Sequence, residues 1–258
     1  MAKKNTGTFT ETFRIPSKGI LYSKEGEEPF SPEVEIRSMT TQEEKMRLGR
    51  QGFWKTMCSL LDAVIVTPEG FETQYATLFD FYFLMYKMRI VSYGSKYKVN
   101  VTCPHCGKSS TITVDLDELE TQYLSDEFVE PFKIGPLPRS KDVLECRFMR
   151  VIDSINNEKK VKEILDNTPD YEGDPGLVLN IASKIQSING EEKSPIEIQK
   201  YIEEMQAMDL AYFNQAYARI TGQVGMKTLC KEDCPHCGEK VEFDLPFNSE
   251  FFRPTFDF

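Results

Sequence analysis

Apolar residues in this chain follow two different spacings. They alternate with polar residues at 96–101, 111–116 and 241–245, and many of them are β-branched. A period of two in such residues predicts β-strands. At 53–64 and 76–91, apolar residues instead recur every three or four positions, which predicts two helices. Because the strands and the helices occupy separate stretches, we expect an α+β fold.

Capping residues indicate where further helices begin. Residues 41–44 match a capping box, so a helix is expected to start near Gln42. Ser194 precedes Pro195, which is favoured at the first helical position, and Asp209 is the expected cap of the last helix. The other predicted elements are a strand at 34–36, a helix or loop at 115–124, a hairpin of strands 132–134 and 143–149, and helices at 153–165, 175–187 and 209–220.

The sequence Cys-Pro-His-Cys-Gly occurs twice, at 103–107 and at 234–238. Each copy places two cysteines on one tight turn next to predicted strands, and its glycine permits the positive φ that such a turn often needs. Two such turns supply four soft ligands, which is the closed tetrahedral form of a structural zinc site. We therefore predict one zinc ion with the following ligands: Cys103, Cys106, Cys234 and Cys237.

Three other interpretations of the motif compete with zinc. Disulfide oxidoreductases also use Cys-Pro-His-Cys, but there a helix follows the first cysteine and lowers its pKa, whereas a glycine and a β-branched run follow here. Two disulfides are the second alternative. The chain starts with polar residues and no apolar stretch typical of a signal peptide, so we expect a cytoplasmic protein with reduced thiols. The third alternative is that the motif occurs by chance, and its duplication argues against this.

The remaining cysteines and the histidines carry weaker signals. Cys230 lies four positions before the second motif and offers an alternative pair, but a fifth thiolate exceeds what a tetrahedral site needs. Cys58 and Cys146 lie in apolar stretches and are expected to be small buried hydrophobic residues. The only two histidines, His105 and His236, lie inside the motifs, so no other histidine is present to form a catalytic site.

Charge and hydropathy exclude other classes of protein. The chain has 258 residues with 41 acidic and 31 basic side chains, a net charge of −10. A zinc ribbon that binds nucleic acid would need a basic face. The longest apolar stretch, 78–90, carries three charged residues and is too short to span a bilayer. We find no phosphate loop and no nucleophile elbow, so we expect a protein without enzymatic activity, nucleic-acid binding or membrane insertion.

The positions of these elements predict a zinc-ribbon-like β module that is split by an insertion. The predicted regions are an extended N-terminal segment (1–40), a helical region (41–94), the split module (95–124 and 223–247), a hairpin plus multi-helix insertion (125–222) and an aromatic C-terminal tail (248–258).

Short motifs follow one another along the chain at 15–22, 40–44, 89–94, 103–107, Gly225, 234–238 and 251–254. Their order resembles the base plate proteins of T-even-like contractile bacteriophages, a family linked with assembly of the base plate hub. The resemblance covers nearly the whole chain, and the paired cysteine motifs are its most specific part. It implies a tail component or assembly factor that is made in the host cytoplasm, can enter the virion tail base plate and has other tail proteins as partners.

A non-enzymatic structural or assembly protein is therefore the expected function, with a thiol-redox enzyme and a nucleic-acid-binding zinc ribbon as alternatives. Aromatic residues at the chain ends bear on the partners. The C-terminal tail is too short for a core of its own, so it either folds back over the hairpin of the second motif or docks on a neighbouring protein. Segment 1–22 could dock likewise. The residues concerned are Phe251, Phe252, Phe256 and Phe258 at one end, and Phe9, Phe13, Leu21 and Tyr22 at the other.

Overall fold

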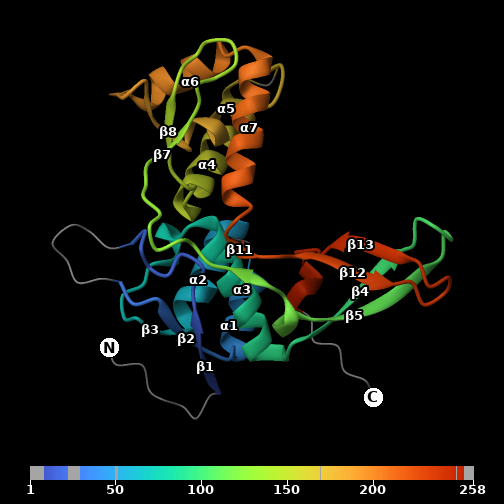
Figure 1. Cartoon of the computed structure of the whole chain (residues 1–258). Helices are drawn as coiled ribbons and strands as arrows, with labels where there is room; N and C mark the ends of the chain where they lie inside the picture. Colours follow the sequence, from blue (N-terminus) through green and yellow to red (C-terminus); the bar gives the residue numbers. More distant parts are fainter. Residues whose placement is uncertain (1–8, 23–29, 50–51, 169, 248, 253–258) are drawn as a thin grey trace.

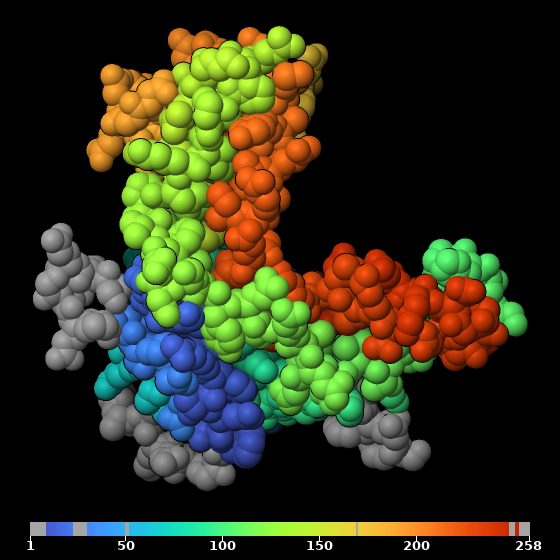
Figure 2. Space-filling model, viewed as in Figure 1, coloured from blue at the N-terminus to red at the C-terminus, as the bar shows by residue number. Residues whose placement is uncertain are grey.

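Three regions make up the protein, which we call the body, the arm and the lobe. The computed structural model describes residues 9–22, 30–49, 52–168, 170–247 and 249–252. The body is formed mainly by residues 9–93, the arm by 96–115 and 229–244, and the lobe by 132–221 (Figure 1). In the space-filling view, the arm and the lobe project from the body in different directions (Figure 2).

The body combines a small sheet with three helices. Its strands lie antiparallel in the order β1-β2-β3, so the strand predicted at 34–36 is confirmed as the middle one. The helix predicted at 53–64 is also confirmed. The elements of the body are β1 (Thr10–Arg14), β2 (Glu33–Arg37), α1 (Thr41–Arg47), α2 (Phe53–Val64), β3 (Ile65–Thr67), the 3-10 helix η1 (Thr73–Tyr75) and α3 (Leu78–Tyr93).

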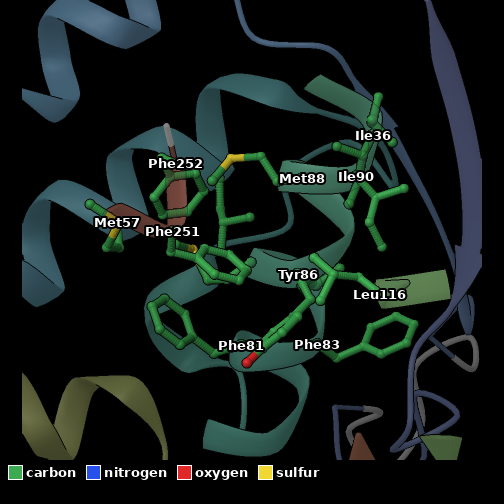
Figure 3. Packing of buried hydrophobic residues seen from close by; sticks show 14 of the residues in the cluster. Ile36, Met57, Phe81, Phe83, Tyr86, Met88, Ile90, Leu116, Phe251 and Phe252 are labelled. Atoms are coloured by element: carbon green, nitrogen blue, oxygen red, sulfur yellow. The ribbon is translucent and has the colours of Figure 1, made fainter. Parts of the chain in front are cut away.

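Helix α3 forms the centre of the body's hydrophobic core. Its sequence is apolar on all sides, and a helix of this kind is buried all round. Thr77 caps its first turn by accepting a hydrogen bond from the backbone N–H of Asp80, and Gly94, with φ +84°, ends it. In Figure 3, side chains from several distant segments surround those of α3, among them Ile36, Met57, Leu116, Phe251 and Phe252.

The arm consists of two antiparallel hairpins, and three of their four strands lie where the alternating pattern predicts them, whereas the strand at 229–233 was not predicted by that pattern. Strand β4 (Lys96–Thr102) pairs with β5 (Ser109–Asp115), and β12 (Leu229–Asp233) pairs with β13 (Lys240–Asp244). The two hairpins form separate two-stranded sheets. A short pair of strands, β6 (Thr121–Gln122) and β11 (Gly225–Met226), holds the two connections to the lobe side by side.

The lobe contains a four-stranded sheet of order β10-β9-β8-β7 covered by helices. Most of its buried apolar residues form a hydrophobic cluster separate from that of the body, whereas Val151 at the start of its first helix belongs to the body's cluster. Its elements are β7 (Phe132–Ile134), β8 (Leu144–Cys146), α4 (Val151–Asn167), α5 (Pro175–Ala182), β9 (Ile185–Ile188), β10 (Glu191–Glu192), α6 (Pro195–Glu203) and α7 (Ala207–Thr221). The predicted β7–β8 hairpin is confirmed, but β8 ends at Cys146 and not at 149 as predicted. The cap Ser194 with Pro195 is also confirmed.

Four predicted helix starts are wrong by one or two residues. Helix α3 begins at Leu78 rather than at 76, and α4 begins at Val151 rather than at 153. The capping box of α1 uses Thr40 and Glu43, one position earlier than predicted. Arg37 selects this register, because its guanidinium lies 2.7 Å from the Glu43 carboxylate. Helix α7 begins after Gln206 rather than at Asp209. The carboxylate of Asp209 instead accepts hydrogen bonds from two backbone N–H groups of the loop that follows β7, at 2.7 and 2.9 Å.

Two further predictions need correction. The helix predicted at 175–187 ends at Ala182, and β9 follows it. Ile185 and Ile188 have helical spacing, but they pair across the sheet with Cys146 and Leu144 of β8. At 115–124, the structure contains the 3-10 helix η2 (Leu116–Glu118) and strand β6 in place of a longer helix or loop. No helix in the described part of the chain has the length and apolar character needed to cross a membrane.

Candidate metal centre

The two cysteine motifs adopt the same backbone turn at the outer end of the arm. The N–H of Gly107 donates to the carbonyl of Cys103, and the N–H of Gly238 donates to that of Cys234, each at 2.9 Å. The two glycines have φ of +70° and +77°. A β-carbon at either glycine would meet no atom within 4 Å. Backbone conformation, rather than space, therefore requires glycine at these positions.

Each turn is closed by a second hydrogen bond, after which the chain continues toward a strand. The N–H of Cys103 donates to the carbonyl of Lys108 at 3.0 Å, and that of Cys234 donates to the carbonyl of Glu239 at 2.9 Å. The segments that follow are strands β5 and β13. A redox motif of this spacing uses a helix N-terminus to stabilise the thiolate, and neither turn leads into a helix.

The fold brings the four motif cysteines together. The sulfur of Cys103 lies 3.8 Å from that of Cys237, and the sulfur of Cys106 lies 3.8 Å from that of Cys234, across 134 and 128 positions of sequence. All four sulfurs lie within 4.8 Å of one another. A tetrahedron with zinc–sulfur bonds of about 2.3 Å has edges of about 3.8 Å, whereas a disulfide bond measures about 2.05 Å. The spacing fits a metal and not a pair of disulfides.

Burial makes this cluster asymmetric. Cys103 and Cys234 are only 2% and 3% exposed, and together with Val241 they form a small hydrophobic cluster of their own. Cys237 is exposed. Val101, Cys106 and Phe243 pack against the cluster from the two hairpins. One side of the sulfur cluster is thus closed by apolar residues, and the other side lies at the protein surface.

The electrostatics of the cluster favour a bound cation. Backbone N–H groups of His236 and Cys237 donate to the sulfur of Cys234 and lower the pKa of this thiol to about 6. For Cys237, the N–H of Glu239 favours the thiolate, but partial desolvation and the neighbouring sulfurs outweigh it and raise the pKa. Negative charge is therefore easy to place on the sulfur of Cys234 and difficult to place on that of Cys237 as well without a cation. An all-sulfur set of this size fits zinc.

The other cysteines and both histidines lie apart from this set. Cys230 is buried in the body's core cluster, with its sulfur 3.7 Å from the carbonyl oxygen of Thr228. Cys58 and Cys146 are buried as predicted, and burial raises the pKa of each thiol to about 12. His105 and His236 are exposed on the two turns.

Sequence reasoning did not identify the apolar residues that support the cysteines. Val101, Val241 and Phe243 contact the cluster, and all three occupy alternating positions of strands β4 and β13. Because the inward side of a strand repeats every second residue, the period of two contained the signal. The sequence alone did not show that the inward sides of the two hairpins face each other.

Three ion pairs neutralise lysines on the faces of the arm. Each joins residues that lie directly opposite each other on paired strands. Paired in this way, the lysines do not form the unneutralised basic face that phosphate binding requires. The pairs are Lys96–Asp115 and Lys240–Asp233, each at 2.7 Å, and Lys231–Glu242 at 2.6 Å.

These features define a mixed protein of helices and strands in which two distant hairpins place four cysteine sulfurs in one cluster. A family model described as T4 bacteriophage base plate protein matches residues 10–253. The chain therefore belongs to the T4 bacteriophage base plate protein family, as the order of its motifs predicted. Comparison with curated proteins and with solved structures found no match.

Proposed function

We propose that this protein is a non-enzymatic component or assembly factor of the phage tail base plate hub, and that a structural zinc ion stabilises it. Family membership over nearly the whole chain carries the base plate assignment. Partners are then other tail proteins. The protein would act in the host cytoplasm during assembly and, if it is a component, remain in the virion tail.

The zinc assignment rests on the four clustered sulfurs of Cys103, Cys106, Cys234 and Cys237. Four thiolates complete a tetrahedral shell and leave no position for a substrate, which separates structural zinc from catalytic zinc. The ion would join the ends of two hairpins that the lobe separates in sequence. Because the unfolded chain has no preformed site, the free energy of metal binding contributes to folding.

Elemental analysis of the natively purified protein tests the metal. We expect one zinc per chain, and its removal by a chelator should increase the reactivity of four thiols. Protein that contains no zinc and has one cysteine pair with a strongly lowered pKa would contradict the proposal and favour the thiol-redox alternative.

Mass spectrometry of purified virions and of assembly intermediates tests the role. Presence in virions identifies a structural component, whereas presence in intermediates alone identifies an assembly factor. A pull-down from infected cells should capture other tail proteins. Absence from both preparations, with no tail protein captured, would contradict a role in the base plate.

A further inference from the structure

Arg89 is a buried cation on the last turns of α3 and is only 1% exposed. Its guanidinium donates hydrogen bonds to the carbonyl oxygens of Phe251 at 3.0 Å and Lys96 at 2.9 Å, and also to that of Gly94. Among the described residues, no carboxylate pairs with it. A buried charge of this kind is tolerated only while its donors stay satisfied, so the three carbonyls must be held in place together.

Two aromatic rings complete the surroundings of this cation. The guanidinium carbon of Arg89 lies 5.0 Å from the centre of the Tyr97 ring and 5.7 Å from that of Phe251. The two rings contact each other edge to face, with centroids 5.3 Å apart. Within about 6 Å, a desolvated cation is attracted to an aromatic face. Arg89 therefore binds Phe251 through both its backbone and its ring.

These contacts meet where the arm joins the body. Gly94 ends α3, and Lys96 and Tyr97 begin the first arm strand, β4. Phe251 belongs to the 3-10 helix η3 (Ser249–Phe252), which follows the last arm strand, β13. The short red helix between α3 and the base of the arm in Figure 1 is this segment. The Tyr97 hydroxyl also donates to the carbonyl of Pro246 at 3.4 Å. One cluster thus connects the start of the arm, its end and the C-terminal segment.

We propose that η3 is a latch that fixes the arm on the body, with Phe251 as its inserted side chain and Arg89 as the positioning residue that receives it. Undocking Phe251 removes one acceptor and one ring from a buried guanidinium. The state in which Phe251 is undocked is therefore strongly disfavoured. We expect the latch to have two states, closed and open. The latch involves no metal ligand, so it goes beyond the proposed function and can fail independently of it.

Hydrogen–deuterium exchange of the full-length, metal-containing protein tests the latch by comparing Phe251→Ala with Phe252→Ala. The two phenylalanines are neighbours and are 0% and 3% exposed, but only Phe251 contacts Arg89 and Tyr97. We expect both variants to lower the melting temperature to a similar extent. Exchange in β4 and in the β12–β13 hairpin should accelerate at least tenfold only in Phe251→Ala, with unchanged exchange in the lobe and unchanged zinc content.

Arg89→Lys provides the second test. It keeps the charge but loses the planar fork that reaches three carbonyls, so arm exchange should again rise at least tenfold while the other core contacts remain. This variant decides the question if Phe251→Ala does not fold. If the arm is equally protected from hydrogen exchange in Arg89→Lys and in the natural protein, the latch proposal is overturned. Equal acceleration of arm and body in both phenylalanine variants would also overturn it, because Phe251 would then be an ordinary core residue.

Discussion

The lobe and the outer end of the arm differ in how much apolar surface each can bury. The lobe has a cluster of buried residues drawn from its sheet and its helices, including Leu144, Ile185 and Phe213. At the outer end of the arm, the buried cluster contains only Cys103, Cys234 and Val241. Burial stabilises at about 25 cal/mol per Å² of apolar surface, so we expect the lobe to gain much of its stability from its own core, whereas the arm end needs another source of stability.

The arm itself shows the same contrast between its inner half and its outer half. Tyr97, Val99 and Leu245 belong to the core cluster of the body, so the inner half of the arm is held by burial. The outer half extends beyond that core and ends in the sulfur cluster. We infer that the arm is secured at one end by apolar packing and by the latch, and at the other end by metal.

Loss of a metal ligand should produce the largest difference in stability between the outer arm and the lobe. We expect Cys103→Ser and Cys237→Ser to lose zinc and to unfold the outer arm, because structural zinc contributes on the order of 10 kcal/mol in small zinc domains. Hydrogen exchange should accelerate in the outer arm and stay unchanged in the lobe. Elemental analysis and the melting temperature measure the loss.

Cys230→Ser is the matched control for these variants. It removes a buried thiol from the body core, 3.7 Å from the nearest backbone carbonyl, and should keep zinc in place despite a small loss of stability. If zinc is lost from this variant instead, the proposed ligand set is wrong.

Removal of the lobe tests whether the arm depends on it. Replacing residues 125–222 by a short linker should preserve one zinc per chain, because all four cysteines lie outside this segment and the cost of loop closure depends only weakly on loop length. Stability should nevertheless fall by several kcal/mol, because Val151 is fully buried in the body core and Phe148 packs against Phe79. Zinc analysis and thermal unfolding measure the two effects.

Val151→Ala in the intact chain is the control that measures how much of this loss comes from one contact. A shortened chain that cannot bind zinc would show that the lobe is integral to the metal centre. The division of the chain into an insertion and a split module would then be wrong.

Local signals in the sequence predicted most of the arm, and nonlocal pairing explains what they missed. Each motif turn and its flanking strands lie in one continuous stretch of sequence, 96–115 or 229–244. The sequence predicts helix as far as Ser187, whereas residues from Ile185 onward form strand β9, and its residues Ile185 and Ile188 also fit helical spacing. The contact between Arg89 and Phe251 spans 162 positions, and no local pattern distinguishes a latch residue from a charge on a helix surface.

The aromatic tail shows the same limit. Phe251 and Phe252 fold back, as one of the two interpretations held, but they pack against α2 and α3 rather than over the hairpin of the second motif (Figure 3). Phe256 and Phe258 lie outside the described residues. At the other end, Phe13 is buried and Phe9 is exposed. Composition indicated aromatic contacts, and only the fold shows which residues are taken up by the protein's own core.

A chain that ends at Asn248 therefore tests how much the C-terminal segment contributes to stability where the arm joins the body. It lacks both buried phenylalanines, each costing about 3–5 kcal/mol on truncation to alanine, so the melting temperature should fall by roughly 10 °C or more. Zinc should remain bound at low temperature. An unchanged melting temperature combined with loss of partner capture would show instead that the tail serves only to dock on another protein.

A fall in pH should destabilise the outer arm before the lobe, and we expect this effect to be smaller than those described above. Protons compete with zinc for thiolates, so the outer arm should lose metal as the pH falls. In the lobe, burial opposes ionisation of Asp209, but the N–H groups of Arg139 and Ser140 prevail and hold its pKa below 3.8. A carboxylate with a lowered folded-state pKa stabilises above its unfolded-state pKa and loses this effect only as the pH falls through the folded-state value.

In mildly acidic solution above about pH 4, exchange should therefore increase in the outer arm while the lobe stays protected. Asp209→Asn should raise the pH at which the lobe opens, without changing zinc release. Simultaneous opening of both regions at one pH, in the natural protein, would contradict their separate sources of stability.

The smallest expected effect concerns the ion pairs on the arm. Lys231 and Glu242 lie 2.6 Å apart on opposite strands, and both side chains are more than half exposed. Exposed pairs of this kind contribute about 0.2–1 kcal/mol, so Lys231→Ala should change the melting temperature by about 2 °C or less and leave zinc bound. A double-mutant cycle with Glu242→Ala measures the pair alone, and salt of about 1 M should have an effect of the same size on the natural protein. If either variant, or salt alone, opened the outer arm, cross-strand charge rather than metal would hold it, and the contrast with the lobe would have to be explained by electrostatics.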